Sequence, residues 1–164
     1  MRRSRLALVV LMLLAVPGIV RAQAIRNRLT LSSITIGFSA VTEANYDAGF
    51  VAASNSITFT FDASKAGGSA SGVQRTSIVS VRATSATMGG TKSVGDLQWR
   101  RSDLGTWNSL STTDATIESR QFVFNGLNDP WTNTVFFRTL LNWTTDTPAA
   151  HSATLTFTLT VTTP

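Results

Sequence analysis

The fold class is decided by the stretch ATLTFTLTV, residues 153–161, in which apolar residues and threonines alternate strictly. Because successive side chains of a strand point to opposite faces, this stretch predicts a strand with one apolar face toward a core and one threonine-lined face. The stretch Val135 to Trp143 alternates as well but is apolar on both faces, which is typical of a central strand. A polar connection containing Pro148 separates the two, and we expect them to form an antiparallel hairpin.

Similar patterns recur throughout the chain. We expect further strands, including one hairpin, at Leu29–Phe38, Ile57–Phe61, Gln74–Ala83, Leu97–Trp99 paired with Trp107–Leu110, and around Phe122 and Phe124. A slip of the alternation at Ser32-Ser33 suggests a bulge or a change of sheet. No stretch shows a convincing helical period. The sequence therefore predicts an all-β fold: a single immunoglobulin-like or related Greek-key β-sandwich of about seven to nine antiparallel strands, preceded by an N-terminal signal helix.

Residues 1–24 have the three zones of a signal peptide. Basic residues at the start precede the 11-residue apolar run Leu6 to Val16, and small residues follow, so that we expect cleavage after Ala22 or Ala24. The run is much shorter than the roughly 20 residues that span a bilayer, so we expect no membrane insertion of the mature chain. The sandwich domain is then 25–164, in a protein exported to the periplasm, the cell surface or the extracellular space.

The leader also explains most of the basic charge. The chain has a formal net charge of +5, with 14 basic and 9 acidic residues. Four of the basic residues, all arginines, lie in the leader, which leaves ten basic residues and a net charge of +1 for residues 25–164. A charge this small and scattered does not favour nucleic acid as a partner.

Few residues are available for catalysis, metal binding or a cofactor. The chain has no cysteine, and its only histidine, His151, has no nucleophile motif beside it, so we expect neither an enzyme nor a zinc site. We interpret isolated aspartates near strand ends as turn residues rather than calcium ligands: Asp47, Asp62, Asp129 and Asp146. The segment Gly89 to Ser93 lacks the spacing of a phosphate-binding loop. It lies in glycine-rich Met88–Gly95, which, like Lys65–Gly72, we expect to be a mobile loop.

Two aromatic residues are candidates for contact with a ligand. Tyr46 and Trp131 have loop-like sequence surroundings, and exposed rings of this kind stack on sugar faces in carbohydrate-binding modules. The alternative is ordinary anchoring of a loop. Trp99, Trp107 and Trp143 fall within strand patterns, and we expect them to pack in the core or across a hairpin.

The stretch Pro148 to Val161 resembles the closing strand of bacterial exported pilin-like sandwiches, the group of spore coat U and Csu-type pilus subunits. In that group a proline and a small residue lead into a last strand with alternating threonines. This chain lacks the cysteine pair and the glycine-tyrosine entry found in many of these subunits. The resemblance implies a surface fibre or envelope subunit in which an apolar strand of one copy completes the sheet of the next. The segment Ile25 to Ile36 is either such a donor or, as we favour, the first strand of a self-complete domain.

Three classes of function remain. A structural or adhesive subunit, self-associating or bound to other envelope proteins by strand pairing, accounts for the leader and the threonine-rich strands without catalysis. A carbohydrate-binding module requires Tyr46 and Trp131 to lie exposed on one face, with a glycan as partner. An enzyme requires an acid or a nucleophile within reach of His151.

Overall fold

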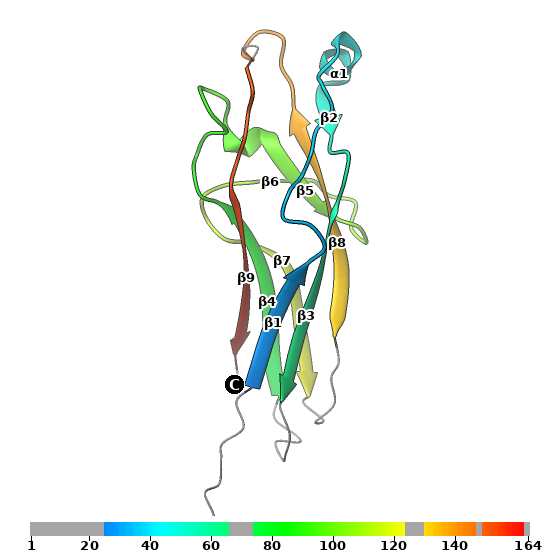
Figure 1. Cartoon of the computed structure of the whole chain (residues 1–164), viewed down its shortest axis with the longest axis vertical. Helices are drawn as coiled ribbons and strands as arrows, with labels where there is room; N and C mark the ends of the chain where they lie inside the picture. The colour runs from blue at the N-terminus through cyan, green and yellow to red at the C-terminus, as the bar shows by residue number, and fades with distance from the viewer. Residues whose placement is uncertain (1–24, 66–73, 124–129, 147–148, 163–164) are drawn as a thin grey trace, which may run out of the picture.

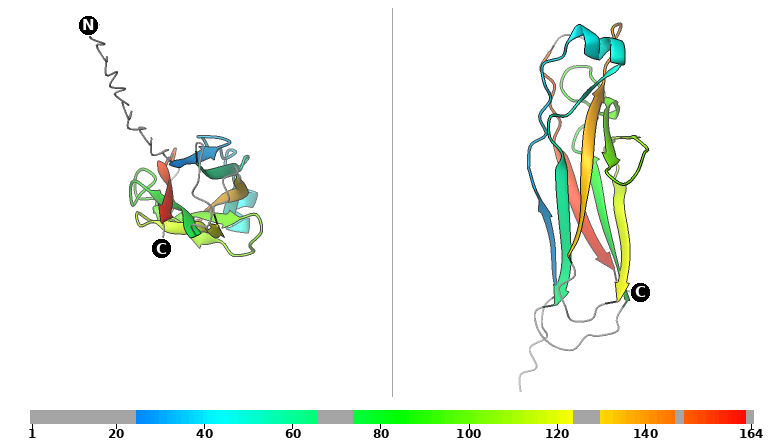
Figure 2. Two further views of the ribbon diagram at one scale, coloured as in Figure 1. Left: turned by 90° about the horizontal axis from the view of Figure 1, so that it is seen from below. Right: turned by 90° about the vertical axis from the view of Figure 1, so that its right-hand side faces the viewer.

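The computed structural model describes residues 25–65, 74–123, 130–146 and 149–162. The predicted leader, Phe124, Asp129 and residues 66–72 of the predicted mobile loop lie outside these residues. In the described part the chain forms two antiparallel sheets packed face to face, which confirms the predicted all-β sandwich. The sheets form two layers when viewed from below (Figure 2).

The larger layer, here called the large sheet, has six strands in the described residues. β8 (Trp131–Leu140) is its central strand, as predicted, because it pairs with three other strands. The path across the sheet is β1 (Ile25–Leu31), β3 (Ile57–Lys65), β8, β5 (Leu97–Arg101) and β6 (Asn108–Ser109), and the short β2 (Phe50–Ala52) also pairs with β8. The β5–β6 pairing confirms the predicted hairpin between Leu97–Trp99 and Trp107–Leu110.

The small sheet has three strands in the described residues. β4 (Gln74–Ala83) lies in the middle, with β7 (Ala115–Val123) on one side and β9 (Leu155–Thr162) on the other. A bulge between Val79 and Ser80 shifts the register of β4 against β7. In Figure 1 β9 and β1 run along the same side of the molecule, although they belong to different sheets, and the two strands are in contact.

The core lies between the sheets and follows the alternation predicted for the strands. Side chains of β3, β4, β5 and β8 point inward from both sheets and are almost fully buried: Ile57, Phe59, Phe61, Val79, Val81, Leu97, Trp99, Val135 and Phe137. Burial of this apolar surface, at about 25 cal/mol per Å², is the main force that holds the cysteine-free fold together. Trp99 packs in the core as expected.

The predicted C-terminal hairpin is wrong. β8 and β9 lie in different sheets, and β9 pairs with β4 in the register Val79↔Leu159. Residues 141–154 therefore form a connection that crosses from one sheet to the other. Trp143 also lies outside β8, because the strand ends at Leu140, and its side chain is 58% exposed.

A short helix, α1 (Glu43–Ala48), is present where no helix is expected from the sequence. Thr42 and Asn45 form a capping box at its start: the Thr42 Oγ1 accepts from the Asn45 amide, and the Asn45 Oδ1 accepts from the Thr42 amide. Gly49, with a φ of 76°, ends the helix in the left-handed conformation. A helix of six residues is too short to show a hydrophobic period in the sequence.

The predicted mobile loop at Met88–Gly95 is ordered in the structure. Met88 and Lys92 are both buried, and the Met88 amide donates to the Lys92 carbonyl over 2.9 Å. The segment continues into a 3-10 turn, η1 (Val94–Asp96), whose Val94 is buried as well. The glycines form the turn, and the buried side chains of Met88, Lys92 and Val94 hold it against the rest of the domain.

Candidate functional site

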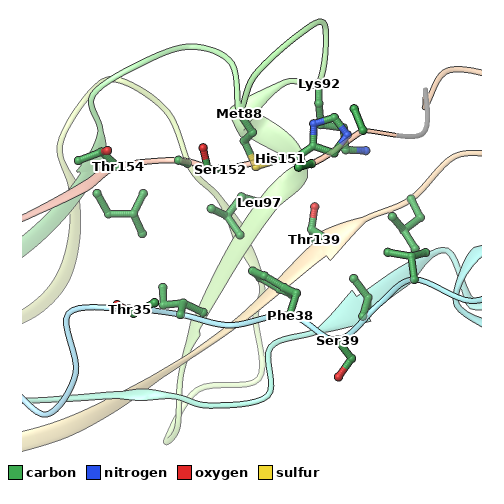
Figure 3. A pocket seen from close by; sticks show the side chains of 18 of the residues that line it. Thr35, Phe38, Ser39, Met88, Lys92, Leu97, Thr139, His151, Ser152 and Thr154 are labelled. Atoms are coloured by element: carbon green, nitrogen blue, oxygen red, sulfur yellow. The ribbon is translucent and has the colours of Figure 1, made fainter.

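An open apolar groove lies between the two sheets where their edges diverge. One wall is the segment that follows β1, residues 32–41, and the other is the segment that leads into β9, residues 149–154 (Figure 3). Strands β5 and β8 cross the floor of the groove in this view. The cavity has a volume of about 1040 Å³. Most of the lining is apolar, and it includes Leu31, Ile34, Ile36, Phe38, Val41, Val51, Ile57, Met88, Leu97, Leu141, Leu155 and Phe157.

The groove is open because the small sheet does not fully cover the large one. In the described residues β9 is the edge of the small sheet and pairs only with β4. Its inward side chains Leu155, Phe157 and Leu159 are half-buried, whereas Val79 and Val81 of the neighbouring β4 are completely buried. The outer edge of β9 therefore has no paired strand among the described residues, although part of β9 contacts β1, and the face beside this edge is half-buried.

After β1 the regular strand pairing gives way to a mixture of backbone and side-chain hydrogen bonds, which position the first wall. The Ser32 amide donates to the Thr58 carbonyl over 2.8 Å, and the Thr58 amide donates to the Ser32 Oγ over 2.9 Å. Further along, the Asn55 Oδ1 accepts from the Gly37 amide over 2.8 Å, and its Nδ2 donates to the Thr35 carbonyl over 2.8 Å. Residues 32–41 are therefore held at the side of the sandwich outside the regular strands, at the Ser32-Ser33 slip noted in the sequence.

Large apolar side chains of this wall are exposed. Ile34 is 96% exposed, and Phe38 and Val41 also stand among the exposed large apolar residues of the described chain. All three line the groove. An exposed apolar surface that continues into an apolar groove is typical of a site of interaction with an apolar partner.

Lys92 and Asp146, which both line the groove, form a buried ion pair. The Lys92 Nζ lies 2.7 and 2.9 Å from the two Asp146 carboxylate oxygens, 3.0 Å from Asp96 Oδ2 and 2.7 Å from the Leu140 carbonyl oxygen. The side chains of Lys92 and Asp146 are only 5% and 6% exposed. The pair ties the 88–96 turn to the connection between β8 and β9.

Both pKa values in this pair move toward the charged forms. Burial disfavours the charged Lys92, but hydrogen bonds to Asp146 and Asp96 outweigh it and raise the lysine pKa above its ordinary value. Burial also disfavours the charged Asp146, but hydrogen bonds from Lys92 and from the Asn142 amide outweigh it and lower the carboxyl pKa. The two groups therefore neutralise each other, and neither is poised for proton transfer near neutral pH.

His151 lies beside this pair and lines the groove and a smaller adjoining cavity of about 210 Å³ (Figure 3). Its side chain is exposed, and the two acids that line the smaller cavity with it, Asp96 and Asp146, are both bound by Lys92. Within the described residues no set of three or more His, Cys, Asp or Glu side chains could hold a metal ion. Asp146, one of the aspartates weighed as calcium ligands from the sequence, instead forms the ion pair with Lys92.

The structure places Tyr46 and Trp131 in separate environments. Tyr46 lies on α1, lines the groove and stacks on Trp143 with ring centroids 4.4 Å apart. Trp131 is the first residue of β8, and Phe50, next to α1, pairs with Leu140 at the other end of that strand. The two candidate ligand residues are therefore at opposite ends of β8 and do not form one surface. Both lie in regular structure rather than in loops.

Trp131 belongs to a polar cluster that joins the two sheets. The buried Glu118 accepts hydrogen bonds from the Trp131 indole over 3.3 Å and from Asn133 over 3.2 Å, and it forms a 2.9 Å ion pair with Arg101. Arg101 also binds Asp103, which is the main reason that the pKa of Asp103 is lowered to about 2. The polar atoms of this cluster satisfy one another, which indicates a structural role.

No protein-family model, curated protein or solved structure matches the chain. In the described residues no helix is long and apolar enough to cross a membrane.

Sequence reasoning singled out Tyr46 and His151, which line the groove, but it did not predict the groove itself or the ion pair of Lys92. The groove depends on which strand forms the edge of each sheet, and periodicity does not contain that information. Lys92 contacts Asp146 and Leu140, which are 54 and 48 residues away, so no local motif reveals the ion pair. The slip at Ser32-Ser33 was the available signal, because it marks where the first wall leaves the sheet.

Proposed function

We propose that this chain is an exported structural subunit of the cell envelope or cell surface, without catalysis of its own, that associates with other subunits by taking an extended apolar segment into its groove. The observation that carries the proposal is the open groove beside the free edge of β9. The resemblance of residues 148–161 to pilin-like closing strands supports the same role.

Strand addition suits this site on physical grounds. An added strand would satisfy the outward backbone groups of β9, and every second side chain would point into the cavity. Its apolar side chains would cover Leu155 and Phe157 of β9 and Ile34 of the opposite wall, which are left partly or fully exposed. Burial of such surface is the main favourable contribution to the association.

The partner is either another copy of this chain or another envelope protein with an apolar strand. Within the chain, the alternating segment 25–36 has the required pattern, although β1 pairs with β3 here. In a second copy this segment would have to leave β3 before it could enter the groove. A free peptide of residues 25–36 avoids that step and tests the segment directly.

The test measures the mass of the chain from Ile25 by size-exclusion chromatography with light scattering over a range of concentrations. The proposal expects concentration-dependent assemblies that the variant I34S/V41S reduces, because both side chains line the groove. L104S is the matched control, since Leu104 is 48% exposed and lies outside the groove.

Assemblies that persist in I34S/V41S, or that L104S reduces equally, would contradict the assignment to the groove. A wild-type chain that stays monomeric and does not bind the 25–36 peptide would argue against self-association and leave another envelope protein as the partner. Failure to capture any apolar strand peptide from a randomised alternating library would overturn the proposal altogether.

A further inference from the structure

A row of alternating aromatic and arginine side chains lies on the outer face of the large sheet, on the side away from the core. The guanidinium of Arg138 lies 5.1 Å from the Phe50 ring centroid and 4.5 Å from that of Trp107. The guanidinium of Arg100 lies 5.0 Å from the same Trp107 ring and 5.7 Å from Phe136. These five residues, here called the arginine ladder, run in the order Phe50, Arg138, Trp107, Arg100, Phe136.

The ladder follows from the strand register. Arg100 of β5 pairs directly with Phe136 of β8, and Gln98 pairs with Arg138, so all four side chains share the outer face. The Arg138 Nε donates to the Gln98 Oε1 over 2.8 Å, which fixes the plane of that guanidinium. Trp107, which precedes β6, lies between the two arginines.

The two ladder arginines differ from the other arginines whose ion pairs are known. Arg101 binds Asp103 and Glu118, and Arg82 lies 3.9 Å from Asp114. In the part of the chain that the structure describes, neither Arg100 nor Arg138 forms an ion pair with a carboxylate. Two positive charges are thus held around one indole ring without an anionic partner among the residues that the structure describes.

The environment of Arg100 makes the lack of an anionic partner more unfavourable. Its Nε is buried and has no hydrogen-bond partner among the described residues, and the ring contacts only partly replace the lost hydration. Attraction between each guanidinium and its rings holds both groups in place, while the two like charges repel each other. An anion that bridges the two groups would remove this repulsion and form paired hydrogen bonds to the planar guanidinium edges.

We propose that the arginine ladder binds an acidic polysaccharide, with the carboxylates of its uronic acid units on Arg100 and Arg138. Phe50 and Phe136 are 36% and 37% exposed at the two ends of the row, where they can contact the apolar faces of sugar rings. The site lies on the opposite face of the large sheet from the groove, so the inference does not depend on strand addition.

The surface that continues the ladder also fits a sugar chain better than a nucleic acid. Further along β3 and β8 the outer face carries two hydroxyl pairs, Thr58 with Thr134 at 2.9 Å and Thr60 with Thr132 at 3.0 Å. Hydroxyls of this kind hydrogen-bond to sugars. Strong binding of a polyphosphate needs many basic contacts, and the chain from residue 25 has only ten basic residues against nine acidic ones.

The test is isothermal titration of the chain from Ile25 with a defined oligogalacturonate, with a neutral gluco-oligosaccharide of the same length as the reference. We expect binding of the oligogalacturonate only, and weaker binding at higher salt. The variant R100Q/R138Q should bind at least about tenfold more weakly, since two charge-assisted contacts are lost. R82Q is the matched control, because it removes an exposed arginine of the other sheet.

A second variant, R100K/R138K, keeps both charges but removes the planar guanidinium groups, and it should also bind more weakly. Circular dichroism and the melting temperature establish that each variant is folded. Equal affinity of the wild type and both ladder variants would overturn the proposal, as would equal binding of the neutral oligosaccharide. Tighter binding of a single-stranded oligothymidylate would assign the ladder to nucleic acid instead.

Discussion

The substitution Lys92→Met tests the buried ion pair between Lys92 and Asp146 in the lining of the groove. Methionine keeps most of the length of the lysine side chain but removes the ammonium group, which has four oxygen atoms within 3.0 Å. Asp146, only 6% exposed, is then left with the Asn142 amide as its remaining hydrogen-bond donor, and the Leu140 carbonyl loses its bond to Lys92. Removing one partner of a buried ion pair costs about 3–5 kcal/mol.

K92M should lower the free energy of unfolding more than Asp146→Asn does. In that variant Lys92 still has the carboxylate of Asp96 and the Leu140 carbonyl, so we expect the free energy of unfolding to fall by about 1–3 kcal/mol. The double variant K92M/D146N should lose less than the sum of the two single variants, because it leaves no buried charge unpaired.

Urea unfolding followed by tryptophan fluorescence measures these differences, provided that the slope of the free energy against urea stays constant. For a domain of this size, K92M should lower the melting temperature by roughly 10 °C or more. The matched control is R82Q, which breaks an ion pair whose side chains are about half exposed and should change the stability by less than about 1 kcal/mol. A K92M variant as stable as R82Q would refute the reasoning.

Three further predictions concern pH, the inter-sheet cluster and one glycine. The pKa of Asp146 is lowered from 3.8, so its contribution to stability is present above that pH and lost as the pH falls through the lower folded value. As the pH falls below 3.8, the wild type should therefore lose more stability in urea titrations than D146N. Glu118→Ala should lower the free energy of unfolding by about 3 kcal/mol in the same assay, because the side chains of Arg101, Asn133 and Trp131 and the Ser119 amide all lose their acceptor. Gly49→Ala should cost about 1 kcal/mol by calorimetry, since Gly49 has a φ of 76° and an added Cβ would meet no atom within 4 Å; a neutral result would contradict the left-handed conformation.

The sequence predicted where the strands lie better than it predicted which strands pair with each other. Alternation identifies Ile57–Phe61, Gln74–Ala83 and the central position of β8, because each pattern reports which faces of a strand are buried. It does not report which strand lies alongside, and the predicted hairpin of β8 with β9 was wrong for that reason. The apolar pattern of β8 also runs on to Trp143, but the Asn142 Oδ1 accepts from the Thr144 amide and turns the chain beyond Leu140.

The candidate sites were less predictable because they depend on contacts between distant segments. The arginine ladder requires the register of β5 against β8 and the position of Trp107, which the sequence predicted only as a strand residue packed in the core or across a hairpin. The groove depends on which strand forms the edge of each of the two sheets. Among the residues singled out from the sequence, Tyr46 and His151 line the groove, whereas Trp131 belongs to the inter-sheet cluster.

The central place of β4 in the small sheet has a kinetic consequence. β7 and β9 each pair with β4 and with no other described strand, and Ala83 of β4 pairs with Leu155, more than seventy residues later. Contacts over such separations require closure of a long loop before any pairing energy is gained, so we expect folding on a timescale of milliseconds to seconds. Until β9 docks, the inward faces of β3 and β8 stay uncovered beside it. A chain with this topology reaches the structure described above only if no other apolar surface binds these uncovered faces before β9 docks.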